Sequence, residues 1–261
     1  MKTLALYSIL TFLLMPVFAQ EVRDIPGPAN FKRLKSESGS FPYWLQHLKL
    51  KKDNTVYLYN GKKKKNQQAQ YAVLDISIGK KDLQQCADAV IRLYAEWQYS
   101  KKQYSKIMFL ATDGTPMDYA SWRQGYRFVL HGEKLKKVKS RGISDQRTDF
   151  DDYLQTVFTY AGTLSLSRQL KQVSSVDDIL PGDVFLQGGS PGHAVMVMDL
   201  SINTGGERRF LLSQSYMPAQ NIHILKNPRS ISPWYSNKFR TELATPEWVF
   251  QTGTLYRWLK T

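Results

Sequence analysis

The chain has 261 residues, a formal net charge of +14, four histidines and one cysteine. A single cysteine cannot form an intrachain disulfide and the scattered histidines offer no ligand pair at zinc spacing, so the composition argues against a disulfide-stabilised fold and a metal site. Lysine-rich runs at 49–52, 62–65 and 134–139 lack the interleaved aromatic residues typical of single-stranded nucleic-acid binding. Two interpretations of these runs remain: they contact an anionic envelope surface, or they form a solvated basic face.

Residues 1–19 have the layout of a secretory signal peptide. Met1-Lys2 gives a short positive start, an apolar stretch follows up to Phe18, and Ala19 is a small residue at the expected cleavage point. The alternative is an uncleaved membrane anchor, but the apolar stretch is short for a bilayer. The signal has no cysteine that could carry a lipid. We therefore expect an exported protein, periplasmic or extracellular, cleaved after Ala19 and without a later transmembrane span.

Residues 20–261 are expected to form one domain, with an N-terminal extension over about 20–70 and a wrapping tail over about 228–261. In the first half, the apolar spacing predicts a short helix up to residue 50 and strands over 55–59 and 71–78. A longer helix is predicted from Asp82, as its N-cap, to Ser100. Cys86 lies near the start of this helix, on its inward stripe.

Strand patterns dominate the second half of the chain. After helices predicted over 150–161 and 165–173, four strands are expected at 184–187, 193–200, 209–216 and 221–225. Helices grouped before an antiparallel meander are typical of an α+β fold.

The lone thiol and a histidine far from it in sequence are the candidate chemical groups. The helix N-terminus favours an anion, so we expect Cys86 to be shifted toward the thiolate. His193 opens a predicted strand after the glycine-rich string Gly-Gly-Ser-Pro-Gly, and a helix packed across the strands would bring the thiol to it. Taken alone, each residue also has a structural interpretation, as a packed core thiol or as a strand-end histidine.

The following strand should supply a group that orients His193. Period-two alternation places Gln214 on one face with Phe210, and its amide oxygen could accept from the imidazole. Ser213 and His223 are the alternatives.

The cysteine at a helix start, the string Pro181-Gly-Asp-Val-Phe and Gly-His193 opening a strand resemble the NlpC-type cell-wall endopeptidases, which are papain-like cysteine hydrolases. The strings Gly-Gly-Ser-Pro-Gly-His193-Ala-Val and Gln214-Ser-Tyr-Met-Pro-Ala-Gln220 resemble more closely a secreted bacterial domain-of-unknown-function family placed near that fold. The second resemblance covers most of the mature chain. The first is confined to the surroundings of Cys86 and to residues 181–214.

The resemblance implies a papain-like fold, with a nucleophile helix packed on an antiparallel β meander. It implies Cys86 as nucleophile, His193 as base and Gln214 as the orienting residue, with no metal or cofactor. The sequence departs from the NlpC-type pattern beside the thiol. Gln85 precedes it and Ala87-Asp88 follow it, where those enzymes have Asp before and Ser-Gly after.

The expected function is an exported cysteine hydrolase that cleaves an amide or peptide bond, with a peptide or peptidoglycan-like substrate. The backbone N–H of Cys86 would form part of the oxyanion hole, with Tyr71 or Gln85 as the second donor. Two alternatives stay open: a non-catalytic envelope-binding module, and an acyl transferase that uses the same thiol.

Overall fold

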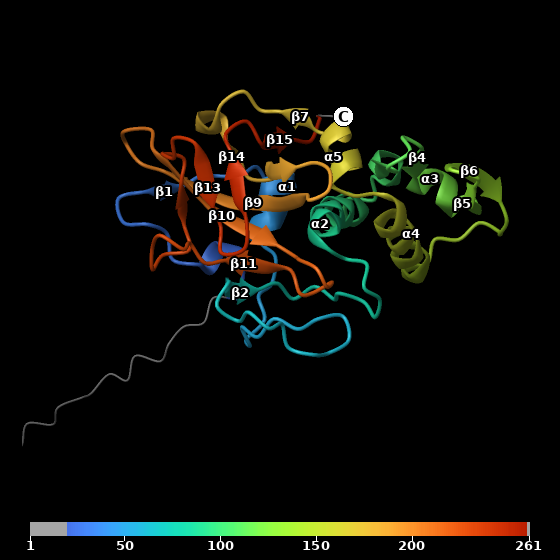
Figure 1. The fold of residues 1–261 in the computed structure, drawn as a ribbon, viewed down its shortest axis with the longest axis horizontal. Coiled ribbons are helices and arrows are strands. Elements are labelled where there is room, and N and C mark those ends of the chain that lie inside the picture. Colours follow the sequence, from blue (N-terminus) through green and yellow to red (C-terminus); the bar gives the residue numbers. More distant parts are fainter. Residues whose placement is uncertain (1–19, 260–261) are drawn as a thin grey trace, which may run out of the picture.

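A nine-stranded antiparallel sheet organises the computed structural model, which describes residues 20–259 (Figure 1). The predicted signal peptide therefore lies outside the described residues. Two short strands extend the sheet: β1 (Lys32–Arg33) pairs with β9, and β12 (Tyr235–Ser236) pairs with β10. The main path follows the order β2 (Gln70–Val73), β11 (His223–Leu225), β10 (Arg208–Gln214), β9 (His193–Ile202), β8 (Val184–Gln187), β15 (Leu255–Arg257) and β7 (Lys171–Gln172).

The expected papain-like α+β fold, with a nucleophile helix on a β meander, is wrong. Strand residues outnumber helical ones, at 29% against 23%. The sheet also takes β2 from the first half of the chain and β15 from its last residues, so strands are not confined to one block of sequence (Figure 1). Such pairings join residues far apart in the chain, and local periodicity does not report them.

Five α-helices accompany the sheet in the described part of the chain: α1 (Phe41–Gln46), α2 (Cys86–Ser100), α3 (Tyr119–Arg123), α4 (Arg147–Tyr160) and α5 (Thr163–Gln169). Single turns of 3-10 helix lie at Val22–Asp24, Tyr104–Lys106 and Val176–Asp178. None of the helices within residues 20–259 is both long and apolar enough to cross a bilayer.

Helix α2 begins at Cys86, so the expected N-cap at Asp82 is wrong. Gln85 is the N-cap, and its backbone N–H donates to Asp88 Oδ2 at 3.0 Å. Asp82 has another role: its Oδ1 accepts from the backbone N–H of Ala219 at 2.7 Å, which ties the segment before α2 to the loop after β10. The thiol therefore occupies the first helical position instead of the second turn.

Strand β9 is the centre of the molecule because both of its faces are buried. Successive side chains of a strand point to opposite faces. Ala194 and Met196 join the core beside α1 and α2, whereas Val195 and Val197 join a second core with Phe250 of the C-terminal strands. Full burial of each valine or methionine side chain contributes about 1.5–3 kcal/mol, so this strand is firmly held.

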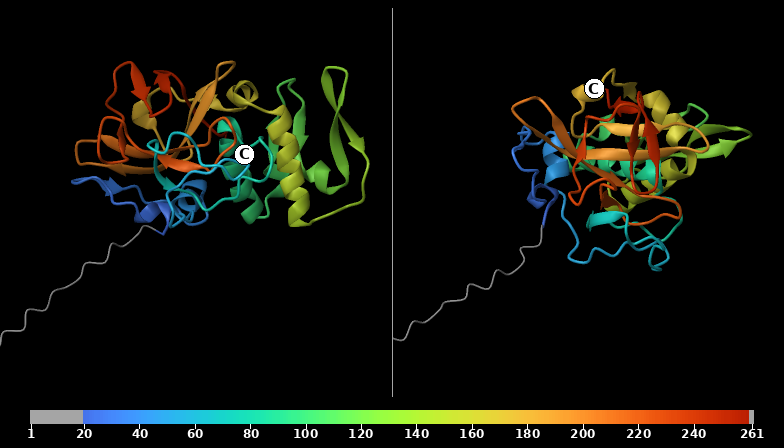
Figure 2. Two further views of the ribbon diagram at one scale, coloured as in Figure 1. Left: turned by 60° about the horizontal axis from the view of Figure 1, so that its bottom comes forward. Right: turned by 60° about the vertical axis from the view of Figure 1, so that its left-hand side comes forward.

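Three separate hairpins complete the fold: β3 (Met108–Leu110) with β4 (Pro116–Asp118), β5 (Tyr126–His131) with β6 (Lys134–Lys139), and β13 (Glu242–Ala244) with β14 (Val249–Gln251). The β5–β6 hairpin extends away from the large sheet at the far side of α4 (Figure 2). The strand expected over 55–59 is not formed, and this segment makes only isolated bridges, such as Tyr57 with Lys63.

Candidate catalytic site

His193 and Gln214 meet across the adjacent strands β9 and β10. Nε2 of His193 lies 2.9 Å from Oε1 of Gln214, and both residues are buried. Ser213, the neighbour of Gln214, lies on the other face of β10. His223 is paired in register with Gln214, and its Nδ1 lies 2.9 Å from the backbone oxygen of Asn221. Of the three expected partners, Gln214 is therefore the one that contacts His193.

The glycine-rich turn before His193 packs closely on α5. A Cβ built on Gly192 would lie 2.3 Å from Thr163 Oγ1 and 2.9 Å from the backbone oxygen of Gln187. A Cβ on Gly188 would lie 2.7 Å from Ser167 Oγ. Because only glycine fits these two positions, the turn is fixed against the helix and sets where His193 begins its strand.

Cys86 is the first residue of α2 and is buried, with 8% of its surface exposed. The backbone N–H groups of Cys86 itself, of Ala87 and of Ala194 all lower the pKa of the thiol, which places the sulfur at the start of α2 and beside the residue that follows His193. Burial and the Asp88 carboxylate outweigh them and raise the pKa of Cys86 to about 11. The expected shift toward thiolate is therefore wrong: the thiol is protonated at neutral pH.

The imidazole is also neutral. Burial lowers the pKa of His193 to about 4, although Gln214 and Glu247 act in the opposite direction. Aromatic rings enclose it, with centroids at 5.0 Å for Tyr216, 5.1 Å for Trp248 and 5.8 Å for Phe250. Hydrogen bonds within residues 20–259 include none between Cys86 Sγ and His193; the sulfur is linked to β9 through the backbone N–H of Ala194, the next residue after His193.

We expect alkylation of Cys86 by iodoacetamide to report this environment. The thiolate is the reactive form. The alkylation rate should therefore keep rising as the pH passes the pKa of an ordinary thiol, and reach half its maximum near pH 11. Asp88→Asn should shift the profile to lower pH because it removes the neighbouring carboxylate. Stopped alkylation reactions read by intact-mass spectrometry give the profile. A rate that levels off below pH 7 would show a thiolate instead.

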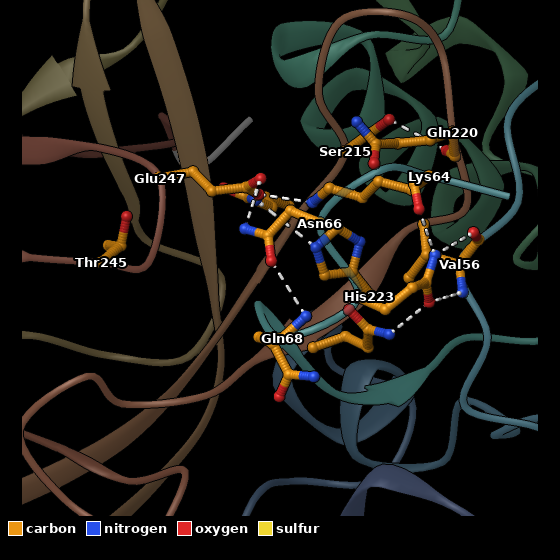
Figure 3. A network of polar contacts seen from close by, with 12 residues as sticks. Val56, Lys64, Asn66, Gln68, Ser215, Gln220, His223, Thr245 and Glu247 are labelled. Atoms are coloured by element: carbon orange, nitrogen blue, oxygen red, sulfur yellow. Dashed lines mark hydrogen bonds and ion pairs between the residues drawn. The ribbon is translucent and has the colours of Figure 1, made fainter.

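A polar cluster gathers around Glu247, with Lys64 and Asn66 pointing toward its carboxylate (Figure 3). Glu247 Oε2 accepts from Gln214 Nε2 at 2.7 Å and from Lys64 Nζ at 2.5 Å, and Glu247 Oε1 accepts from Asn66 Nδ2 at 3.2 Å. Neither Lys64 nor Glu247 could be recognised as a site residue from the sequence. Lys64 belongs to a run interpreted as exposed, and Glu247 lies in the tail without any local motif.

Of the two expected second oxyanion donors, the Gln85 side chain is engaged elsewhere. Gln85 Nε2 donates to Asp82 Oδ1 at 3.2 Å, and Tyr71 lies on β2. The N–H groups that act on the sulfur belong to the start of α2 and to Ala194. These backbone donors are the better match for a developing oxyanion.

The three side chains Cys86, His193 and Gln214 are all buried. A cavity of about 320 Å³ is lined by Leu83 and Gln84, just before α2, and its lining does not include Cys86, His193 or Gln214. No group of three His, Cys, Asp or Glu side chains in residues 20–259 could hold a metal ion. The arrangement therefore offers a thiol, an imidazole and backbone donors as its chemical groups.

Comparison with known proteins gives a family but no relative of known activity. A family model described as Domain of unknown function (4846) matches residues 22–257. No curated protein and no solved structure gives a match. The expected resemblance to a domain-of-unknown-function family is thus confirmed at that level, whereas the resemblance to NlpC-type and papain-like hydrolases gains no support.

Proposed function

Since the chain belongs to the family described as Domain of unknown function (4846), we propose a function from the site itself: a cysteine-dependent hydrolase of amide bonds that uses Cys86, His193 and Gln214. The observation that carries the proposal is the contact of 2.9 Å between His193 Nε2 and Gln214 Oε1. An amide oxygen accepts, so Nε2 carries the proton and the other ring nitrogen, Nδ1, has a free lone pair. General-base catalysis needs such a lone pair within reach of the thiol, and the proposal assigns this role to Nδ1.

The proposed reaction starts from two neutral groups. Nδ1 of His193 takes the proton from the Cys86 thiol while the sulfur attacks the amide carbonyl carbon, and the carbonyl oxygen becomes an oxyanion facing the α2 N-terminus. The C–N bond then breaks, and the imidazolium gives its proton to the leaving amine. A thioester on Cys86 remains. His193 next takes a proton from water while the oxygen attacks the thioester carbonyl, the C–S bond breaks, and the imidazolium returns its proton to the sulfur, which releases the acid and the free thiol.

The starting protonation states support transfer of the proton during attack. With a thiol pKa of about 11 and an imidazole pKa of about 4, a stable thiolate–imidazolium pair does not form in the free protein. Activity that depends on neutral His193 falls only as the pH drops through about 4. Above that value the base is available across the neutral range.

A peptide is the proposed substrate class, with the peptide part of peptidoglycan as the probe for an exported protein. Muropeptides released from cell-wall sacculi should be shortened by the native protein and left intact by Cys86→Ala, as followed by liquid chromatography and mass spectrometry. Identical products from both proteins would remove Cys86 from the mechanism. Addition of a primary amine tests the acyl-transfer alternative, since an amide of that amine would then replace the free acid.

A cationic hairpin favours a second property, contact with an anionic lipid bilayer. On β6, Lys134, Lys136 and Lys139 are exposed, and Val129 and Val138 are 49% and 46% exposed beside them. Lysines attract anionic headgroups, and exposed apolar side chains enter the interfacial region of a bilayer. Binding to an acidic polymer would need the lysines but not the exposed valines. The hairpin extends away from the body, so its outer face can approach a flat surface (Figure 2).

We expect this hairpin to bind phosphatidylcholine vesicles only when they contain phosphatidylglycerol. Replacing Lys134, Lys136 and Lys139 by Gln should weaken binding by about 1 kcal/mol for each lysine that contacts the surface. The matched control replaces Lys62, Lys63 and Lys65, which are exposed elsewhere on the molecule. These substitutions remove the same amount of charge. Vesicle co-sedimentation measures the difference. Equal losses for both triple variants would show that binding follows net charge and not this hairpin.

A further inference from the structure

We propose that Glu247, balanced by Lys64, is a positioning residue that fixes the amide of Gln214 and thereby the tautomer of His193. The inference rests on the proposed function and deepens it. Glu247 and Lys64 are 183 residues apart, and their side chains are 14% and 7% exposed. A buried ion pair is weak evidence for stability in itself, because desolvation of the charges offsets most of their attraction. Because Glu247 of this pair contacts Gln214, the ion pair can instead orient the Gln214 amide.

The orientation of the Gln214 amide follows from the chemistry of Glu247. An ionised carboxylate only accepts hydrogen bonds, so the atom of Gln214 at 2.7 Å from Glu247 Oε2 must be the NH₂ group. The carbonyl oxygen of the same amide then faces His193 Nε2 at 2.9 Å, and that nitrogen must carry the proton. Glu247 thus selects the tautomer whose Nδ1 can act as the base, without touching the imidazole.

His223 adds an independent constraint in the same direction. Burial lowers the pKa of His223 to about 3, so the ring is neutral. Its Nδ1 lies 2.9 Å from the backbone oxygen of Asn221 and must donate, which leaves Nε2 as an acceptor. That Nε2 lies 3.4 Å from Gln214 Nε2 and receives the second hydrogen of the amide. Oε1 of Gln214 therefore accepts from His193, and Nε2 of Gln214 donates to Glu247 and to His223.

Both charges are held in place by the backbone around them (Figure 3). Glu247 lies at the tip of the β13–β14 hairpin, where Thr245 Oγ1 donates to the backbone oxygen of Trp248 at 2.8 Å. The backbone N–H of Lys64 donates to the oxygen of Val56 at 2.9 Å, and Gln67 Nε2 donates to the oxygen of Lys64 at 2.8 Å. The C-terminal tail and the N-terminal extension thus meet at Gln214.

Nuclear magnetic resonance of imidazole nitrogens tests this inference without any substrate. In the ¹⁵N-labelled native protein at neutral pH, we expect His193 to carry its proton on Nε2. The charge-swapped variant Lys64→Glu/Glu247→Lys keeps an ion pair but places a donor against Gln214. Its amide should then turn, present NH₂ to His193 and convert a large part of the population to the Nδ1–H tautomer. The value of kcat should fall in proportion to the remaining Nε2–H population.

A native protein with His193 protonated on Nδ1 would overturn the proposal, whatever the variants do. A folded charge-swapped variant with an unchanged tautomer would also overturn it, because a purely structural ion pair predicts that result. If the swap does not fold, Lys64→Met/Glu247→Gln removes both charges together and should give a mixture of tautomers; a single Nε2–H form there contradicts the proposal. A tautomer that follows Glu247, combined with muropeptide cleavage that survives Cys86→Ala, would refute the proposed function alone.

Discussion

Replacement of His193 by Gln should lower kcat/KM for muropeptide cleavage by about 10²–10⁴-fold, the usual contribution of a general base. Glutamine has no lone-pair nitrogen, so it cannot take the proton from a thiol whose pKa is about 11. Without that transfer, the fraction of thiolate at neutral pH is too small to support attack. The measurement is the initial rate of product formation at several substrate concentrations.

The matched control for this variant is His131→Gln, since His131 is exposed on β5. It removes one histidine far from the site and should leave the rate unchanged. Similar rates for the native protein and His193→Gln would mean that another group accepts the proton. A fall that appears equally in His131→Gln would point to general destabilisation instead of lost catalysis.

Acid should destabilise the fold because two buried histidines resist protonation. The pKa of His193 is lowered to about 4 and that of His223 to about 3, from an unfolded value of 6.5. A group whose pKa is lower in the folded than in the unfolded state contributes stability at pH values above its unfolded pKa. This stability is lost as the pH falls from 6.5 through the folded pKa. The expected loss in the free energy of unfolding by pH 4 is about 3 kcal/mol for each histidine.

His223→Gln isolates one of these contributions. The buried carboxyls Asp88, Asp183 and Asp199 have raised pKa values, so their protonation adds stability in acid and offsets part of the loss. A comparison of variants cancels this common background. Urea unfolding at pH 7 and pH 4 should show a smaller loss for His223→Gln than for the native protein, by about 3 kcal/mol. Equal losses in both proteins would contradict the role of His223, and His131→Gln should behave as the native protein does.

The contact between His193 and Gln214 could be predicted because it depends on local rules. Both residues lie on strands that follow one another in sequence and pair antiparallel, and alternation separates Gln214 from Ser213. The glycine-rich turn before His193 also has a local cause, since Gly192 has no room for a side chain. These features need no knowledge of distant parts of the chain.

The rest depends on segments that meet only in three dimensions. Lys64 comes from the N-terminal extension and Glu247 from the tip of a hairpin near the C-terminus, and no local pattern links them. The protonation of Cys86 is a similar case. A helix N-terminus predicts a thiolate, but the depth of burial and the charge of Asp88 decide the outcome. The papain-like fold was wrong for the same reason, because strands from the whole chain enter one sheet.

The most direct test of the account is to find the acyl group during turnover. The native protein is mixed with muropeptides, quenched in acid after a short time and examined by intact-mass and peptide mass spectrometry. We expect a muropeptide fragment bound as a thioester to Cys86 in the native protein. Cys86→Ala should carry no such fragment. Products that form at the native rate without any adduct on Cys86, or with Cys86→Ala, would contradict it.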